Sequence, residues 1–474
     1  MRSGAPVVAA GSPLRTPAPA LLAVALPALL ALALSTLAPA AHAQPLPHRT
    51  ESATAVGFWR SFGDPTLEAL IGRALEANLD LRAAGARVDA ARAERLSSAL
   101  DLVPSITAVA GYSRQQLATA AVPGPGAGAL GQELWDAGVQ LSWEVDVFGR
   151  ARRSLQARNA LIDAAEGEVD DVGVLLAAEV ALAYFDLRGA RNRLAVAGRN
   201  ARNQRETLEV TLDRLEAGRG TALDSERAQA QLSSTLAAIP LLETAVAAAR
   251  HRIDVLLGRP PGSTGAELGE DSAPVTLPDT LALSISQALI LSRPDVRSAE
   301  HRLAASSASV GSAKAEYLPR LSITGVAGYT AGAFDALGGS GTPRYAVGPV
   351  VSWPLLDLGR VQARVNAARA DEAEAEARYE SAILNARADV ETALVAYHGT
   401  QARLRHLEEA AAASERATEL ARLRFDEGAS DFLQVLDAER TQLDAQDRLA
   451  LGRTEAMTAL VAVYRALGGQ WPDR

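Results

Sequence analysis

An internal repeat constrains the possible folds of this chain more than any other feature. Five residues recur in the same order 210 positions later: Gly138, Ser142, Trp143, Gly149 and Arg150 return as Gly348, Ser352, Trp353, Gly359 and Arg360. Shorter matches pair Ser105-Ile106-Thr107 with Ser322-Ile323-Thr324, Ala183-Tyr184 with Ala396-Tyr397, and Leu223-Asp224 with Leu436-Asp437. This many ordered matches indicate a tandem duplication, so the fold must be built from two copies of one unit.

Each copy contains one long segment without proline, Arg150 to Ala217 in the first and Arg360 to Phe425 in the second. Both segments are rich in Ala, Glu, Arg and Leu, which have the lowest cost in a helix. At about 1.5 Å per residue, each helix would be roughly 100 Å long. No globular core holds a helix of that length, so the pattern predicts a coiled coil or a tube.

A glycine-containing break follows each long segment, at Gly218 and at Gly428. Helical composition then resumes and ends at Leu257-Gly258 and at Leu467-Gly468. A break this short turns the second helix back along the first. We therefore expect two antiparallel helical hairpins, over 150–257 and 360–467.

The segments before the long helices have a different period. From Val139 to Val147 every odd residue is apolar and every even one is polar, which predicts a strand with one lipid-facing and one wet face. We expect strand hairpins over 104–147 and 319–356. The predicted lipid face holds Val139, Leu141, Trp143, Val145 and, in the second copy, Trp353; the predicted water-lined face holds Gln140, Ser142, Glu144 and Asp146.

Residues 1–43 read as an export leader. Arg2 and Arg15 precede an apolar run from Leu21 to Leu37, and Ala41-His42-Ala43 offers a cleavage site before Gln44. The alternative for this run is a transmembrane anchor. After the leader we find no stretch of 18 or more apolar residues, so we expect strands to form any membrane span. The remaining organisation is a first repeat over 44–258, a linker over 259–290, a second repeat over 291–468 and a tail over 469–474.

Four strands per chain cannot close a barrel, because the open edges would leave unpaired backbone groups in lipid. The chain therefore needs copies of itself. Three copies would give twelve strands, but the residues alone leave two, three or four copies open.

Several other classes of protein are disfavoured. A net charge of −9 with no basic cluster argues against a nucleic-acid partner. Gly126-x-Gly128-x-x-Gly131 fits a dinucleotide fingerprint but leads into a strand rather than a helix. His251, His301, His398 and His406 lack ligand spacing, and the chain has no cysteine. We therefore expect no metal, no cofactor and no catalytic residues, and hence no enzyme.

Three motifs carry a resemblance to a known family. They are Phe58-Trp59-Arg60-Ser61-Phe62-Gly63-Asp64, the segment from Ser142 to Arg150, and Arg293-Pro294-Asp295-Val296-Arg297-Ser298-Ala299-Glu300. With them, residues 56–470 resemble the TolC-like outer-membrane efflux proteins of the OprM/NodT branch. The resemblance implies a mainly α fold with a β-barrel: a homotrimer with a twelve-stranded transmembrane barrel and a long antiparallel helical tunnel, in the bacterial outer membrane.

The resemblance also implies partners and a function. The expected partners are a periplasmic adaptor, an inner-membrane pump of the resistance-nodulation-division type and outer-membrane lipid. The expected function is passive conduction of drugs and other toxic small molecules from periplasm to exterior. A duct for type I protein secretion or for metal efflux is the alternative, and a secreted coiled-coil scaffold without a pore is a more remote one.

Family similarity places candidate site residues at the hairpin tips. Leu433 and Asp437 would form the pore constriction, where a ring of carboxylates favours cations; alternatively Asp437 faces a neighbouring helix and pairs with Arg440. Arg214, Gly218, Asp224, Arg424 and Gly428 would meet the adaptor, although the glycines could serve only as turns. Asp224 corresponds to a site that ties neighbouring hairpins.

The chain departs from the family at two positions. Many members of the branch carry a cysteine after the leader for lipid attachment, whereas this chain has Gln44 there. The position of the family's tying arginine holds Ser430. We therefore expect anchoring by the barrel alone, and the family's tip lock is in doubt.

Overall fold

The computed structural model describes residues 58–60, 62–116, 131–264, 268 and 287–470. All of them belong to one compact unit, Thr50–Arg474. The predicted leader over 1–43, Gln44, and most of the linker over 259–290 lie outside the described residues.

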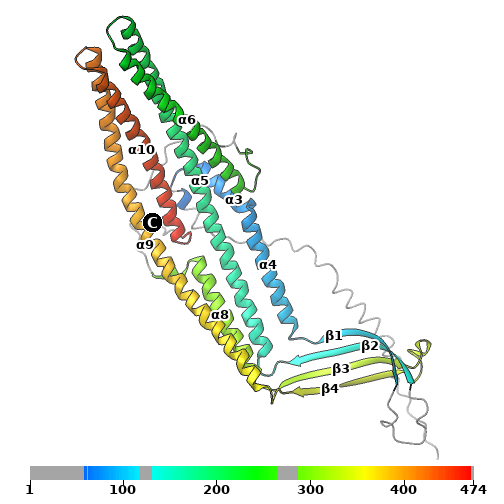
Figure 1. Cartoon of the computed structure of the whole chain (residues 1–474). Coiled ribbons are helices and arrows are strands. Elements are labelled where there is room, and N and C mark those ends of the chain that lie inside the picture. The colour runs from blue at the N-terminus through cyan, green and yellow to red at the C-terminus, as the bar shows by residue number, and fades with distance from the viewer. Residues whose placement is uncertain (1–57, 61, 117–130, 265–267, 269–286, 471–474) are drawn as a thin grey trace, which may run out of the picture. The chain divides into compact units, whose positions relative to one another are not determined.

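The elements follow one another in the order of a duplicated chain. The first copy contains α3 (Pro65–Ala77), α4 (Leu79–Leu100), β1 (Ser105–Gln116), β2 (Gly131–Val145), α5 (Arg150–Glu216) and α6 (Ala222–Leu256). The second contains α7 (Gln287–Leu291), α8 (Pro294–Ala315), β3 (Arg320–Ala331), η2 (Phe334–Ala336), β4 (Pro343–Ser352), α9 (Leu358–Asp426) and α10 (Phe432–Ala466). Helices α5 and α9 each run from the strands to a tip turn (Figure 1).

The four strands form one antiparallel sheet in the order β1-β2-β3-β4, so β1 and β4 are open edges. Ser105 lies opposite Ser142, and Arg320 lies opposite Ser352. The structure therefore matches Ser105 with Arg320, two residues before the Ser322 that the sequence pattern suggested. A shift of two residues keeps every side chain on the same face, so alternation could not reveal it.

The last strand of each hairpin ends earlier than predicted, because the predicted hairpins extended to residues 147 and 356. Strand β2 ends at Val145, and Asp146 does not line water from a strand. Its carboxylate accepts hydrogen bonds from Ala151 N (3.2 Å) and Arg152 N (2.9 Å), which are unpaired donors in the first turn of α5. Strand β4 ends at Ser352, because Pro354 has no N–H to donate. Trp353 therefore lies just past the strand.

The helices form two groups, one near the sheet and one toward the tips, and in each group they lie side by side as the strands do in the sheet. Near the strands, α4 packs on α5, and α8 packs between α5 and α9. Toward the tips, α6 packs on α5, and α10 packs against both α5 and α9. Among the described elements, the open sides are thus β1 and β4 in the sheet, α4 and α9 near the sheet, and α6 and α9 near the tips.

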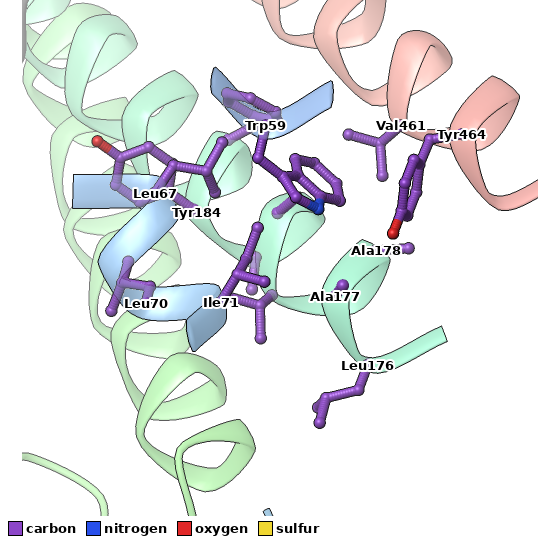
Figure 2. Packing of buried hydrophobic residues seen from close by; sticks show 14 of the residues in the cluster. Trp59, Leu67, Leu70, Ile71, Leu176, Ala177, Ala178, Tyr184, Val461 and Tyr464 are labelled. Carbon is purple, nitrogen blue, oxygen red and sulfur yellow. The ribbon is translucent and has the colours of Figure 1, made fainter. Parts of the chain in front are cut away.

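An aromatic cluster joins the N-terminal segment to the hairpins. The rings of Phe58 and Tyr464 stack with their centroids 4.7 Å apart, and the Trp59 ring lies 4.6 Å from Tyr464. Figure 2 shows Trp59 facing Tyr464 of α10, with Leu67 and Ile71 of α3 in the same cluster. The first family motif is therefore a packing element.

Asp64, the last residue of that motif, fixes α3 against α5. One carboxylate oxygen caps α3 by accepting from Thr66 N (3.0 Å) and Leu67 N (3.3 Å). The other accepts from Tyr184 Oη (2.7 Å) and Arg188 Nη1 (2.6 Å) on α5. Asp64 thus satisfies the start of one helix and anchors it to another.

In each repeat, the N-cap residue of one helix donates a hydrogen bond to the end of the return helix, but the donating side chain differs between the two repeats. Asn78, the N-cap of α4, donates from Nδ2 to Leu256 O at the end of α6 (3.0 Å). Arg293, the N-cap of α8, donates from Nη1 to Ala466 O at the end of α10 (2.6 Å). The third family motif, which begins at Arg293, is thus also a structural junction.

One helix has the length and average hydropathy of a membrane span, although no unbroken run of 18 apolar residues follows the leader. Among the described residues, α6 contains an 18-residue window with a mean hydropathy of 1.5, which is long and apolar enough to cross a membrane by length and composition alone. Polar residues such as Thr235 are scattered through it. The apolar character of α6 is therefore an average over the window rather than a continuous run.

Candidate functional site

The tip turns of the two hairpins have the same geometry. Gly218 and Gly428 have φ of 69° and 76°, which favours glycine. Arg219 N donates to Arg214 O, and Ala429 N donates to Arg424 O, each at 2.7 Å. These bonds close the ends of α5 and α9 in the manner of a Schellman motif. Both glycines are exposed, so the turn role leaves the tip surface accessible.

The return helices begin with different caps at matching positions. Thr221 and Asp224 form a capping box at the start of α6, in which Thr221 Oγ1 accepts from Asp224 N (3.3 Å). At the start of α10, Asp431 accepts from Gln434 N (3.2 Å). Because α6 and α10 begin 210 positions apart, the repeat mate of Asp224 is Gln434. The predicted match of Asp224 with Asp437 is wrong by three residues.

Leu433 and Asp437 lie on one exposed face of α10. Leu433 is 50% exposed, and Asp437 Oδ1 accepts from Arg440 Nη2 at 2.9 Å. The ion pair with Arg440 is therefore present, but it lies on Asp437's own helix and both side chains are exposed. The negative charge of Asp437 thus has a positive charge beside it.

Arg214 ties the two hairpins of the chain together at their tips. Its guanidinium carbon lies 3.8 Å from the ring centroid of Phe425 on α9, and Arg214 Nη2 lies 3.8 Å from Asp426 Oδ1. Phe425 borders a small apolar cluster with Ala228, Phe432 and Val435. Arg424, the repeat mate of Arg214, is exposed instead. The two tip arginines thus have different environments.

A buried polar node joins three helices farther from the tips. Glu439 of α10 is 6% exposed, and its Oε1 accepts from Arg422 Nη2 of α9 (2.7 Å) and from Thr207 Oγ1 of α5 (3.0 Å). A charged group this deeply buried requires such partners. The node fixes α10 against both of its neighbours.

Two further polar links cross between α5 and α10. Arg193 makes a bidentate pair with Asp447, at 2.7 and 3.0 Å, and Asn200 Nδ2 donates to Gln446 Oε1 at 3.3 Å. We call the links from Arg193, Asn200 and Thr207 to α10 the polar seam. The polar seam was not among the predicted sites, although polar residues that are buried or half-buried recur at helical spacing along α5: Asn200, Gln204, Thr207 and Thr211.

The predicted lipid face of the strands is continuous across the sheet. Leu141 lies opposite Gly325, which lies opposite Val347, and a side chain at Gly325 would touch both. Val139, Leu141, Trp143 and Val145 are partly covered in the single chain, while Trp353 is 48% exposed. The two tryptophans fix equivalent corners, since Trp143 Nε1 donates to Leu102 O and Trp353 Nε1 to Tyr317 O, each at 3.0 Å.

An amphipathic sheet with two open edges, joined to long helical hairpins with exposed tips, defines an outer-membrane export channel. The chain matches the outer membrane efflux protein family over residues 70–259 and 285–469. It therefore belongs to that family, in its OprM/NodT type. It is the outer-membrane channel component of a tripartite efflux system, a class of channels rather than enzymes.

Individual relatives agree with this assignment. The chain is 31% identical to the pyoverdine export outer membrane protein OpmQ of Pseudomonas aeruginosa over 427 residues, 89% of each chain. It is 30% identical to nodulation protein T of Rhizobium leguminosarum bv. trifolii over 421 residues, 88% of each. The solved outer-membrane channel OprN superposes with a TM-score of 0.81 at 41% identity, covering 87% of this chain and 92% of OprN.

Proposed function

We propose that three copies of this chain form a duct of twelve strands and twelve long helices that passively conducts small molecules from periplasm to exterior. The observation that carries the proposal is the set of open sides, because no other described element covers the first and last elements of the sheet and of both helical layers. Open strand edges are not stable in lipid. The export of pyoverdine named for OpmQ supports a small-molecule cargo.

Exposed apolar side chains mark the surfaces that would meet. On α9 they include Leu384, Val395, Leu420 and Leu423, and on α6 they include Leu223, Leu236, Leu241 and Val255. Contact between α9 of one copy and α6 of the next would remove both sets from water. The apolar window of α6 is then a subunit interface.

The internal repeat predicts which residues of β4 would lie opposite which residues of β1 in the next copy of the chain. Within one chain, Leu141 of β2 lies opposite Gly325 of β3. Their repeat mates are Val351 of β4 and Ala110 of β1, matched through the equivalent pairs Ser142–Ser105 and Ser352–Arg320. We expect Val351 to lie opposite Ala110 of the next copy.

Cysteine pairing tests both the register and the number of copies. The chain has no cysteine, so Ala110→Cys with Val351→Cys introduces the only thiols. Mild oxidation should give covalent dimers and trimers on a denaturing gel, and no larger species. Each single variant is the control and should give no trimer. Monomers alone from the double variant would contradict the proposed assembly.

We also propose that the tips receive a periplasmic adaptor, with an inner-membrane pump of the resistance-nodulation-division type beyond it. The exposed tip positions Gly218, Arg424 and Gly428 support this role. Arg214 and Asp224 contribute by holding the tip geometry, since both are engaged within the chain. Copurification from host membranes should yield both partners, and recovery of the channel without any adaptor after gentle solubilisation would count against it.

Leu433 and Asp437 are proposed to line the constriction, with the charge of Asp437 balanced by Arg440. In planar bilayers, Arg440→Gln should raise the preference for cations, because the Asp437 carboxylates would lose their neighbouring charge. Asp437→Asn should lower that preference. If neither substitution changes ion selectivity, these residues do not line the pore.

For the chain itself we propose a leader over 1–43, a first repeat over 44–258, an equatorial linker over 259–290, a second repeat over 291–468 and a tail over 469–474. The boundaries 258 and 468 are glycines that end the return helices, with φ of 67° and 66°. Mass analysis of the mature N-terminus would test the first boundary.

A further inference from the structure

Exposed apolar side chains gather where the sheet joins the helices. Four turns make this junction and lie at one end of the sheet (Figure 1): 101–104, 146–149, 316–319 and 353–357. Each turn carries at least one exposed apolar side chain, and the first residue of α9 adds another. We call this set the apolar collar: Val103, Val147, Phe148, Leu318, Leu356 and Leu358.

The neighbouring copies of the proposed trimer do not account for this exposure. Strands β2 and β3 lie in the interior of the sheet, so the turn after β2 and the turn before β3 have the turns on both sides of them within one chain. Even so, Val147 is 52%, Phe148 is 50% and Leu318 is 41% exposed. A second copy would cover only the turns at the sheet edges, so the collar needs a partner of another kind.

The aromatic residues of the lipid face indicate how far the strands reach across the membrane. Near the outer end of β2, the ring of Trp135 lies 4.6 Å from that of Tyr112 and 5.2 Å from that of Phe334. Trp143 lies on the same face of β2, only eight residues farther along. At about 3.3 Å per residue and a tilt of about 40°, this segment spans about 20 Å, less than the apolar band of about 25 Å around such barrels. The collar begins just beyond Trp143, where the rest of the band would lie.

The chemistry of the turns suits the boundary between lipid tails and headgroups. Their backbone groups lie outside the strand ladders, and such groups are not stable in hydrocarbon. Each turn also carries one carboxylate: Asp101, Asp146, Glu316 or Asp357. At the headgroup level, apolar side chains can reach the acyl boundary while polar groups stay hydrated.

Arginines follow the collar directly at the start of both long helices. Arg150, Arg152 and Arg153 lie in the first turn of α5, and Arg360 lies in that of α9. Neither first turn contains an acid, although the helix dipole favours anions there. Carboxylates outside the two helices balance three of these charges: Glu144, Asp146 and Asp357. Arg153 Nη1 donates instead to an amide, Gln156 Oε1 (2.8 Å), so a lipid phosphate would be stabilised beside it.

We propose that the apolar collar inserts into the headgroup region of the inner leaflet of the outer membrane, with phospholipid as its partner, and that Arg153 and Arg360 face the lipid phosphates. This rests on the proposed function, in which the sheet spans that membrane. The contact with lipid then extends past the ends of the strands and fixes the depth of the channel. Anchoring therefore involves the turns as well as the barrel.

Quenching by spin-labelled lipids tests the position of the collar. The chain has no cysteine, so Phe148→Cys carries a fluorophore at one position only. In phosphatidylcholine vesicles, a spin label near the headgroup should quench it about threefold more than a label at the end of the acyl chain, because the collar lies at the headgroup boundary. Val347→Cys, on the lipid face of β4, should be quenched more by the acyl-chain label. Leu212→Cys, similarly exposed on α5 toward the tips, should be quenched by neither.

The outcomes distinguish the collar from the channel itself. Quenching at position 347 without quenching at position 148 would overturn the collar and leave the membrane-spanning sheet in place. Stronger quenching at 148 by the acyl-chain label would also overturn it, since the turn would then lie in hydrocarbon. If neither position is quenched, the sheet does not span the bilayer and the proposed function fails as well.

The charge of the lipid tests the arginines. With headgroup-labelled phosphatidylglycerol in place of phosphatidylcholine, quenching at position 148 should rise about twofold, because arginines near the surface enrich anionic lipid. Arg153→Gln combined with Arg360→Gln should remove this difference. Arg219→Gln, an exposed arginine at the tip, is the matched control and should keep it. Equal quenching by the two lipids in the parent, or an unchanged difference in the double variant, would contradict the role of these arginines.

Discussion

The two ends of the helical hairpins are held by different chemistry. Around α3, the hairpins enclose aromatic and aliphatic residues that are almost inaccessible to water, such as Phe58, Phe185 and Tyr464. Toward the tips, the contact between α5 and α10 includes a small apolar cluster together with Thr207, Glu439 and other polar groups. Apolar burial is lost whenever surfaces part, whereas polar groups can exchange their partners for water. The tip half is therefore the part of the chain that can separate at a lower cost.

The largest expected effect is in the aromatic cluster. Trp59→Ala should destabilise the fold by about 3–5 kcal/mol, because a large cavity would remain between α3 and α10. Thr207→Ala in the polar seam should cost about 1 kcal/mol. Denaturant unfolding of the detergent-purified protein, followed by circular dichroism, measures both. If the two variants lost equal amounts of unfolding free energy, the aromatic cluster and the polar seam would not differ in their contribution to stability.

Alkaline pH should act selectively on the aromatic cluster. Burial raises the pKa of Tyr464 from 10.0 to about 12. Stability that depends on this neutral phenol is complete below pH 10 and is lost as pH rises through 12, because the unfolded chain ionises first. At about 1.4 kcal/mol per unit, the loss approaches about 3 kcal/mol.

The control for this effect is Tyr464→Phe, which removes the ionisable group and keeps the ring. Its free energy of unfolding should fall less between pH 10 and 12 than that of the parent chain. Parallel pH profiles for the two proteins would rule out Tyr464 as the source of alkaline sensitivity.

A substitution in the buried polar node should lower the free energy of unfolding by an intermediate amount, and its structural effect should stay near α10. Glu439→Ala removes the acceptor for Arg422 and Thr207 and should cost about 2 kcal/mol. Faster hydrogen exchange is expected in α10 near this position, with little change around α3. Gln229→Ala, at the repeat-equivalent position, is the matched control. Faster exchange spread over the whole chain would show that the two ends are not independent.

The smallest expected effect is at Arg193. Its pair with Asp447 is about one-third exposed on both sides, so solvent screening limits Arg193→Gln to about 0.5 kcal/mol. The difference between variant and parent should shrink further at high salt. Arg403→Gln, which breaks an ion pair inside one hairpin, is the comparison. A loss at Arg193 that does not depend on salt would point to packing of the side chain rather than to its charge.

Much of the fold could be predicted from local signals. Proline-free composition predicted α5 and α9, and Gly218 and Gly428 predicted the tip turns, because only glycine readily adopts the φ required there. Alternation predicted strands with two distinct faces. These features depend on residues close together in sequence. The fold class was therefore predictable, and the similarity to OprN confirms it.

Other features depended on partners far away in sequence. The matches of Tyr184 with Tyr397 and of Asp224 with Asp437 were each wrong by three residues, close to one helical turn, so the periodic pattern could not expose the error. Asp146 was predicted to line water but caps α5, because the unpaired N–H groups of that helix lie within its reach. The contact of Arg214 with Phe425 joins residues of different repeats.

The sequence by itself determined that this protein is a duplicated chain of long helical hairpins and amphipathic strands, and that it needs copies of itself. Period, composition and turn residues suffice for that, because they act over a few residues at a time. Only the tertiary structure decided the register between the two repeats and which polar groups meet. Those choices rest on hydrogen bonds and ion pairs such as Thr207–Glu439 and Arg193–Asp447, whose partners are selected by geometry rather than by spacing along the chain.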